Sequence, residues 1–477
     1  MKNSRLRKLL RSLRQEEFRR LGKFIRSPFF NYTRAQVQLY EYLKKDFPDF
    51  ADKRLEKKRV WKKIYPGQPF NENKYWRLCT NFTKLVEKFL VTIQLESEQG
   101  EARKILIRSL GKRNLYGLYE KETHSYLHAI AEKPHRDVEY YSDKARLQFD
   151  YFFHPLTPKL THDDEALIDL MESTDKQFVL AKLRIGSELK NRESILAKKY
   201  QMRFLDEIFN ESKRGFLSDN ELFKIYDRLF RLYAEKEETN HFFDLKNALS
   251  ASRETLRNID LSLMMTQMIN YAIQRVNTGD INFSKETLDL YKLSLQFDLI
   301  VNNGTIEEAV FGNIVSLGCY NKDYVWVEQF VSDYSSYLDL SIRGGTVIYS
   351  NAAIHFSKGE FDKTIFLLTQ HHFSGYHQTR VRLMVVRAAF EKFITNENNY
   401  GFLLSQIDSF EKFLRRDGLQ KETKRISFLN FLQFLKKAAN ISLGKKHKRE
   451  TELLLDKIKN EKYLVFRSWL VQKVTKY

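Results

Sequence analysis

The chain has 477 residues, with 81 lysines and arginines against 61 aspartates and glutamates, giving a formal net charge of +20. A hydrophobic share of 42% excludes wholesale disorder, and only seven prolines and 18 glycines favour long helices. The two cysteines, Cys79 and Cys319, have no Cys-X-X-Cys spacing. This excludes a disulfide framework and a cysteine zinc site, and it favours a reducing, cytoplasmic location.

The uncharged stretches of the chain are short. The longest, residues 261–274 and 344–357, have 14 residues each, whereas a membrane helix needs roughly 18–20, so no transmembrane segment is expected. Charged residues interrupt every apolar stretch of the first 18 residues, so no signal peptide is expected either.

The positive charge is concentrated at the start of the chain. Residues 1–90 hold 24 lysines and arginines against nine acidic residues, a net of +15, which leaves only +5 for all the other residues. A basic head on a nearly neutral body has a field that attracts a polyanion to one end.

Helical spacing of apolar residues begins at the N-terminus. Residues 6–25 follow this pattern, with an expected break at Ser12, where Ser12 and Gln15 fit a capping box. Pro28 ends the segment, because the residue before a proline disfavours helical geometry. Further helices are expected at residues 34–45 and 55–65.

The next expected helix, residues 71–93, has the clearest pattern in the chain. Asn71 is its expected N-cap, after the turn Pro66-Gly67-Gln68-Pro69. Its apolar stripe consists of Tyr75, Leu78, Cys79, Phe82, Leu85, Val86, Phe89, Leu90 and Ile93. The opposite face carries Lys74, Arg77, Asn81, Lys84 and Lys88. The helix is therefore expected to dock through one side and to present cations on the other.

Helical patterns continue to the C-terminus without any sustained strand alternation. They include residues 165–192 and 221–236. From Asp260 onward, a weak repeat places each of Tyr324, Phe361 and Tyr400 at the turn between the two helices of one repeat. Residues 306–415 resemble tetratricopeptide repeats, with Gly359-Glu360-Phe361 at a turn between helices. The resemblance implies superhelical stacking, with the three aromatic rings packed at the turns.

Two turns of the head carry a second resemblance. The sequence SPFFN at residues 27–31 and YPGQPFNENKYWRL at residues 65–78 resemble the opening of a family of Bacteroidota helical proteins. The family has no assigned function, so the resemblance implies a helical head and says nothing about activity.

The joined helices at residues 57–65 and 71–93 leave two interpretations open. They fit a helix-turn-helix whose longer helix enters a major groove, and they also fit an ordinary helical hairpin with a solvated lysine face. The candidate nucleic-acid-binding residues are Lys57, Lys58, Lys62, Lys63, Lys74, Arg77, Asn81, Lys84 and Lys88. A third interpretation is that the first 26 residues lie on an anionic membrane as an amphipathic helix.

No constellation typical of an enzyme is found. His124 and His128 have the spacing of two metal ligands on a helix but lack a third, and no cofactor or metal site is predicted. The predicted fold is all-α. It comprises a basic helical head at residues 1–95, a helical middle at 96–257 and a tetratricopeptide-like superhelix at 258–477. An alternative is one right-handed solenoid throughout.

Two classes of function follow from this organisation. In the first, the chain is a non-enzymatic scaffold whose superhelix binds a protein and whose head contacts DNA or RNA. In the second, the head contacts an acidic protein instead, and the chain is a protein-only adaptor.

Overall fold

In the computed structural model, the regular secondary structure of the described residues consists of helices joined by turns and loops. The described residues are 4–155, 157, 164–196, 198–235, 238–373, 376–416, 422–444 and 448–475. Within these ranges the only extended pairing is an isolated bridge between Asn302 and Thr305, and no strand occurs. The prediction of an all-α fold is confirmed.

The chain divides into two compact units. Unit 1 comprises Met1–Lys133 and Ser142–Thr174, and unit 2 comprises Pro134–Tyr141 and Asp175–Tyr477. The boundaries expected near residues 95 and 257 stay predictions.

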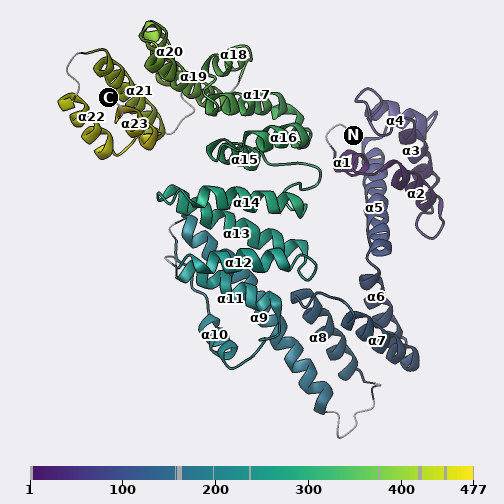
Figure 1. Cartoon of the computed structure of the whole chain (residues 1–477). Helices are drawn as coiled ribbons and strands as arrows, with labels where there is room; N and C mark the ends of the chain where they lie inside the picture. The colour runs from purple at the N-terminus through teal and green to yellow at the C-terminus, as the bar shows by residue number, and fades with distance from the viewer. Residues whose placement is uncertain are drawn as a thin grey trace. The chain divides into compact units, whose positions relative to one another are not determined.

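Unit 1 begins with the helices of the basic head, in which α1, α2 and α3 pack against α5 and α4 packs against α3 (Figure 1). Its helices are α1 (Arg5–Arg11), α2 (Gln15–Arg26), α3 (Arg34–Lys44), α4 (Lys57–Ile64), α5 (Glu72–Ser97), α6 (Gln99–Lys112) and α7 (Tyr116–Ala131), with parts of α8 (Val138–Phe152) and α9 (Asp164–Leu196). One hydrophobic cluster, from Leu6 to Phe89, joins α1 to α5, because each helix turns its apolar face to the same centre.

The start of α2 differs from the expectation. The break at Ser12 is correct, but the capping box of Ser12 with Gln15 is wrong. Helix α2 begins at Gln15, and the backbone N–H of Arg14 donates to Glu17 Oε2 at 2.7 Å. Ser12 instead ends α1, with its hydroxyl donating to the Leu9 carbonyl.

Unit 2 is an array in which each helix from α13 to α23 packs against the next along the chain (Figure 1). Its helices are the remainder of α8 and α9, then α10 (Leu205–Lys213), α11 (Glu221–Ala234), α12 (Asn240–Ala251), α13 (Asn258–Asn277), α14 (Phe283–Gln296), α15 (Glu308–Tyr320), α16 (Tyr324–Tyr334), α17 (Leu340–Ser357), α18 (Phe361–Thr369), α19 (Tyr376–Thr395), α20 (Tyr400–Arg416), α21 (Glu422–Leu443), α22 (Lys448–Asn460) and α23 (Arg467–Val474). Two short 3-10 turns lie at Ser335–Tyr337 and Glu397–Asn399.

The aromatic residues of the expected repeat lie where one helix of a pair gives way to the next. Tyr324, Phe361 and Tyr400 are the first residues of α16, α18 and α20, and all three side chains are half-buried. The Tyr324 hydroxyl donates to the Ser357 carbonyl at 2.9 Å, and the Tyr400 hydroxyl donates to Asn440 Oδ1 at 2.6 Å. Each hydroxyl therefore bonds to the helix pair that follows its own. The superhelix itself stays a prediction.

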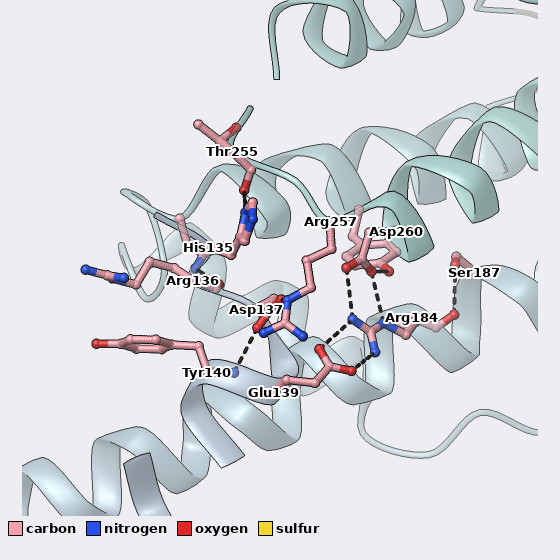
Figure 2. Close-up of polar contacts among 12 residues, drawn as sticks. His135, Arg136, Asp137, Glu139, Tyr140, Arg184, Ser187, Thr255, Arg257 and Asp260 are labelled. Carbon is pink, nitrogen blue, oxygen red and sulfur yellow. Dashed lines mark hydrogen bonds and ion pairs between the residues drawn. The ribbon is translucent and has the colours of Figure 1, made fainter. Parts of the chain in front are cut away.

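A buried ionic cluster fixes the N-terminal part of unit 2 (Figure 2). Arg184 of α9 donates to Glu139 of α8 at 2.9 and 3.2 Å and to Asp260 of α13 at 3.0 and 2.9 Å. Asp137, just before α8, pairs with Arg257, just before α13. Arg184 thus joins α8 to α13, and the pair of Asp137 with Arg257 joins the residues just before the same two helices. This part of the array is therefore held by charge as well as by packing.

Candidate nucleic-acid interface

Helix α5 has the two faces that its sequence predicts. Asn71 caps it, accepting from the Lys74 backbone N–H at 2.9 Å. Six stripe residues are buried: Tyr75, Leu78, Cys79, Phe82, Val86 and Phe89. The exposed face carries Lys74, Arg77, Asn81, Lys84 and Lys88, here named the α5 row. With a rise of 1.5 Å per residue, the row extends for about 21 Å.

The middle of the α5 row is unpaired. Arg77, Asn81 and Lys84 make no side-chain hydrogen bond or ion pair with any residue that the structure describes. The acids of the head are held by other cations. Examples are Glu87 with Arg5 at 2.8 Å, Asp52 with Arg7 at 2.7 Å, and Glu41 with Arg26. The positive charge of the row is therefore not neutralised internally.

Aromatic rings lie under both ends of the row. The ammonium of Lys74 is 4.3 Å from the centre of the Tyr65 ring, and that of Lys88 is 5.0 Å from the centre of the Phe30 ring. Tyr65 belongs to the YPGQPF turn and Phe30 to the SPFFN turn. Cation–π contact restrains both lysines while leaving each residue exposed. The two turns that carry the family resemblance thus flank one surface.

Packing holds the turn between α4 and α5 in place. The indole N–H of Trp61 donates to the Gln68 carbonyl at 3.0 Å, and the Phe70 ring packs edge-on against Trp61 with their centres 5.6 Å apart. Gly67 has φ +78, which its lack of a Cβ permits. The short α4 and the long α5 therefore meet at a fixed turn.

The four candidate lysines of α4 differ in their surroundings. Lys58, Lys62 and Lys63 are exposed, with no hydrogen bond or ion pair to another residue of the described ranges. Lys57 is half-buried, with its ammonium 2.7 Å from Glu72 Oε1 and 4.6 Å from the centre of the Trp76 ring. The hydrogen bond from Lys57 lowers the pKa of Glu72. Of the nine candidates, Lys57 is thus the one already paired with a carboxylate.

Sequence reasoning missed two exposed rings beside the row. Phe29 is 76% exposed and Tyr32 is 88% exposed, both in the loop between α2 and α3. The sequence did contain a signal for them, namely the three aromatic residues of SPFFNY. The sequence alone does not show which of these rings are buried.

A second surface, in unit 2, is apolar. A groove of about 950 Å³ lies between α9 and α13. Its lining includes Ile185, Leu189, Ile259, Leu263 and Leu299. Ile185 and Ile259 are 62% and 61% exposed. Contiguous apolar surface of this kind is typical of interaction sites.

Metal and membrane features were also sought across the described ranges. No cluster of three or more histidine, cysteine or acidic side chains there could hold a metal ion, and His124 instead packs edge-on against Tyr151. None of the helices in that part of the chain combines the length and apolarity needed to cross a bilayer.

Comparison of the chain with family models, curated proteins and solved structures finds no match. The resemblances to the Bacteroidota family and to tetratricopeptide repeats therefore stay predictions.

Proposed function

We propose that the chain is a non-enzymatic scaffold that binds nucleic acid through the α5 row and a protein partner through the helical array of unit 2. The observation that carries the proposal is that the cations of the α5 row pair with no carboxylate of the described residues, on a head with a net charge of +15.

The geometry of the row suits a phosphate backbone. Each strand of a duplex presents one phosphate per 3.4 Å, so a row of about 21 Å is long enough for about six phosphates of one strand. Arg77 and the lysines supply cations along the row, and Asn81 supplies an amide donor between them. The exposed Lys58, Lys62 and Lys63 of α4 add charge to the same head.

The apolar groove between α9 and α13 supports the second half of the proposal. Two exposed isoleucines on its rim offer area that a partner's side chains would cover, which is worth about 25 cal/mol per Å² removed from water. Carboxylates and guanidinium groups line the same groove, among them Glu188 and Arg192, so a partner with both apolar and charged residues fits it.

A charge-neutralised variant tests the nucleic-acid half. Fluorescence anisotropy measures binding of a labelled duplex to the full-length protein and to Arg77→Gln/Lys84→Gln/Lys88→Gln between about 50 and 200 mM salt. We expect weaker binding at every duplex sequence, and a slope of log K against log salt that is smaller by up to about 0.9 per lost contact.

The matched control removes the same charge elsewhere. Lys285, Lys412 and Lys457 are exposed lysines of unit 2, and replacing all three with Gln is expected to leave affinity and slope unchanged. Equal weakening by both triple variants would mean that net charge alone drives binding. Wild-type protein that binds no oligonucleotide at about 50 mM salt would overturn the proposal in favour of an acidic protein partner.

A further inference from the structure

The loop after α2 is firmly anchored by two of its residues. The Phe30 ring stacks on Phe24 with ring centres 3.9 Å apart and an interplanar angle of 15°. The Asn31 amide donates to the Ile25 carbonyl at 2.9 Å, and its Oδ1 accepts from the Thr33 backbone N–H at 2.9 Å. These contacts fix the loop at both ends of residues 25–33.

The same loop leaves its two other rings in solvent. Phe29 touches the edge of Phe30, with centres 4.9 Å apart and planes at 90°, yet it is 76% exposed. Tyr32 is 88% exposed and makes no hydrogen bond or ring contact with the residues that the structure describes. Burial of aromatic surface is favourable, so the fold leaves this stabilisation unused at both positions.

The loop that carries these rings contacts one end of the α5 row. The Phe30 ring touches Phe29, and its centre lies 5.0 Å from the ammonium of Lys88; Tyr32 follows Phe30 by two residues in the same loop. The surface therefore combines a line of cations with exposed rings at one end, and the rings are held by a loop that needs little ordering on binding.

A single-stranded nucleic acid presents the matching groups. Its phosphates are spaced along one side, and its unpaired bases expose π faces that stack on aromatic side chains irrespective of base identity. In a duplex the bases are stacked on one another, so only the phosphates could use this surface.

We propose that Phe29 and Tyr32 stack on unpaired bases of a single-stranded nucleic acid whose phosphates lie along the α5 row. This inference rests on the proposed function, since it names the class of nucleic acid that the row binds.

The test measures anisotropy of a labelled oligothymidylate of about 20 nucleotides and of a duplex of equal length, at about 50 mM salt, with full-length protein. Stacking on one base is worth about 5- to 150-fold in affinity. Phe29→Ala/Tyr32→Ala is expected to lose at least about 5-fold on the oligothymidylate and to change less than about 2-fold on the duplex.

Two controls accompany this variant. Phe29→Trp/Tyr32→Phe keeps both ring faces and is expected to retain single-strand affinity. Leu340→Ala removes an apolar side chain that is 82% exposed in unit 2 and is expected to have no effect on either ligand. Circular dichroism of the alanine variant is expected to match the wild type, because neither ring is packed in the core.

The outcomes separate this inference from the proposed function. If the wild type binds duplex and the alanine variant binds both ligands as well as the wild type, the stacking inference is wrong and the proposed function stands. If the wild type binds neither ligand, both are wrong. Retention on vesicles containing anionic phosphatidylglycerol that is lost in the alanine variant, without oligonucleotide binding, would assign the rings to a membrane surface instead.

Discussion

Arg184 lies between two carboxylates of very different exposure. The Asp260 side chain is 1% exposed and that of Glu139 is 41% exposed, and the guanidinium donates to both. Burial raises the pKa of Asp260, whereas the hydrogen bond from Arg184 lowers the pKa of Glu139. Tyr226 also donates to Asp260, at 2.8 Å. The carboxylate of Asp260 is thus a buried charge, and it is tolerated because Arg184 and Tyr226 donate hydrogen bonds to it.

Removing Arg184 is expected to leave that buried charge uncompensated. Arg184→Met should lower the free energy of unfolding by about 3–5 kcal/mol at neutral pH. The pKa of Asp260 should then rise further. A carboxyl whose native pKa is above its unfolded value costs stability as the pH rises through the native pKa. The difference in free energy of unfolding between the variant and the wild type should therefore shrink as the pH falls from 7.5 towards 5.

Urea denaturation followed by circular dichroism at several pH values measures this recovery. Arg192→Met serves as the control, because Arg192 pairs with Glu188 on the surface at 2.7 Å and such pairs contribute less than about 1 kcal/mol. If Arg184→Met lowers the free energy of unfolding by the same amount at every pH, the role given to Asp260 is wrong.

Both cysteines are expected to be inert in the folded protein. Burial raises the pKa of the Cys319 thiol to about 12 and also raises the pKa of Cys79, so neither forms appreciable thiolate near pH 8. Ellman's reagent should detect almost no thiol in native protein and two thiols per chain in denaturant. Rapid native reaction of one thiol would show that its surroundings open readily.

At the scale of elements, helices with a strong apolar stripe on one face could be predicted from the sequence. Their N-caps could be predicted for some helices and not for others. Helix α5 was expected at residues 71–93 with Asn71 as its cap, and it runs from Glu72 to Ser97 with that cap. At α2 the local pattern allowed Ser12 as a cap, but Leu13 is buried in the core of the head. The observed start of α2 also has a local contact, since Glu17 accepts from the Arg14 backbone N–H, and local spacing alone does not tell this start from one at Ser12.

Close packing of α2 on α3 gives a prediction at the same scale. A Cβ at Gly22 would lie 2.5 Å from the hydroxyl oxygen of Tyr40, which is buried and donates to the Phe18 carbonyl. Alanine favours a helix over glycine by about 1 kcal/mol, but displacing a buried ring costs about 1–3 kcal/mol. Gly22→Ala is therefore expected to lower the melting temperature.

The control for this change is a helical glycine with space around it. A Cβ at Gly344 in α17 would meet nothing within 4 Å. Gly344→Ala is thus expected to stabilise the protein by up to about 1 kcal/mol. If Gly22→Ala also raises the melting temperature, the contact between α2 and α3 is looser than the structure indicates.

At the scale of the whole molecule, charge density in the sequence located the candidate surface but not its details. The excess of +15 in residues 1–90 and the outward spacing of cations on α5 were evident from composition and helical periodicity. The pairing of Lys57 with Glu72 and the rings under Lys74 and Lys88 were not. Those contacts come from α4 and from two turns that fold back onto α5, and the periodic pattern of one helix carries no information on which other segments reach it.

The contrast between the lysines of the α5 row and Lys57, which pairs with Glu72, predicts how far each lysine is protected by a bound nucleic acid. Acetylation by an activated ester, followed by mass spectrometry, reports how accessible each ammonium group is with and without a saturating oligothymidylate. Lys84 and Lys88 should be strongly protected by the oligonucleotide, because phosphates cover the α5 row. Lys57 should react slowly in both states, since Glu72 already holds its ammonium at 2.7 Å.

The rest of the molecule provides the internal reference for that experiment. Lys285, Lys412 and Lys457 are exposed in unit 2, where the chain beyond residue 90 has a net charge of only +5, and their reaction rates should not change. Uniform protection of all six lysines would indicate that the oligonucleotide binds non-specifically over the whole surface and has no defined site. Protection confined to unit 2 would move nucleic-acid binding away from the head and leave the α5 row to an acidic protein.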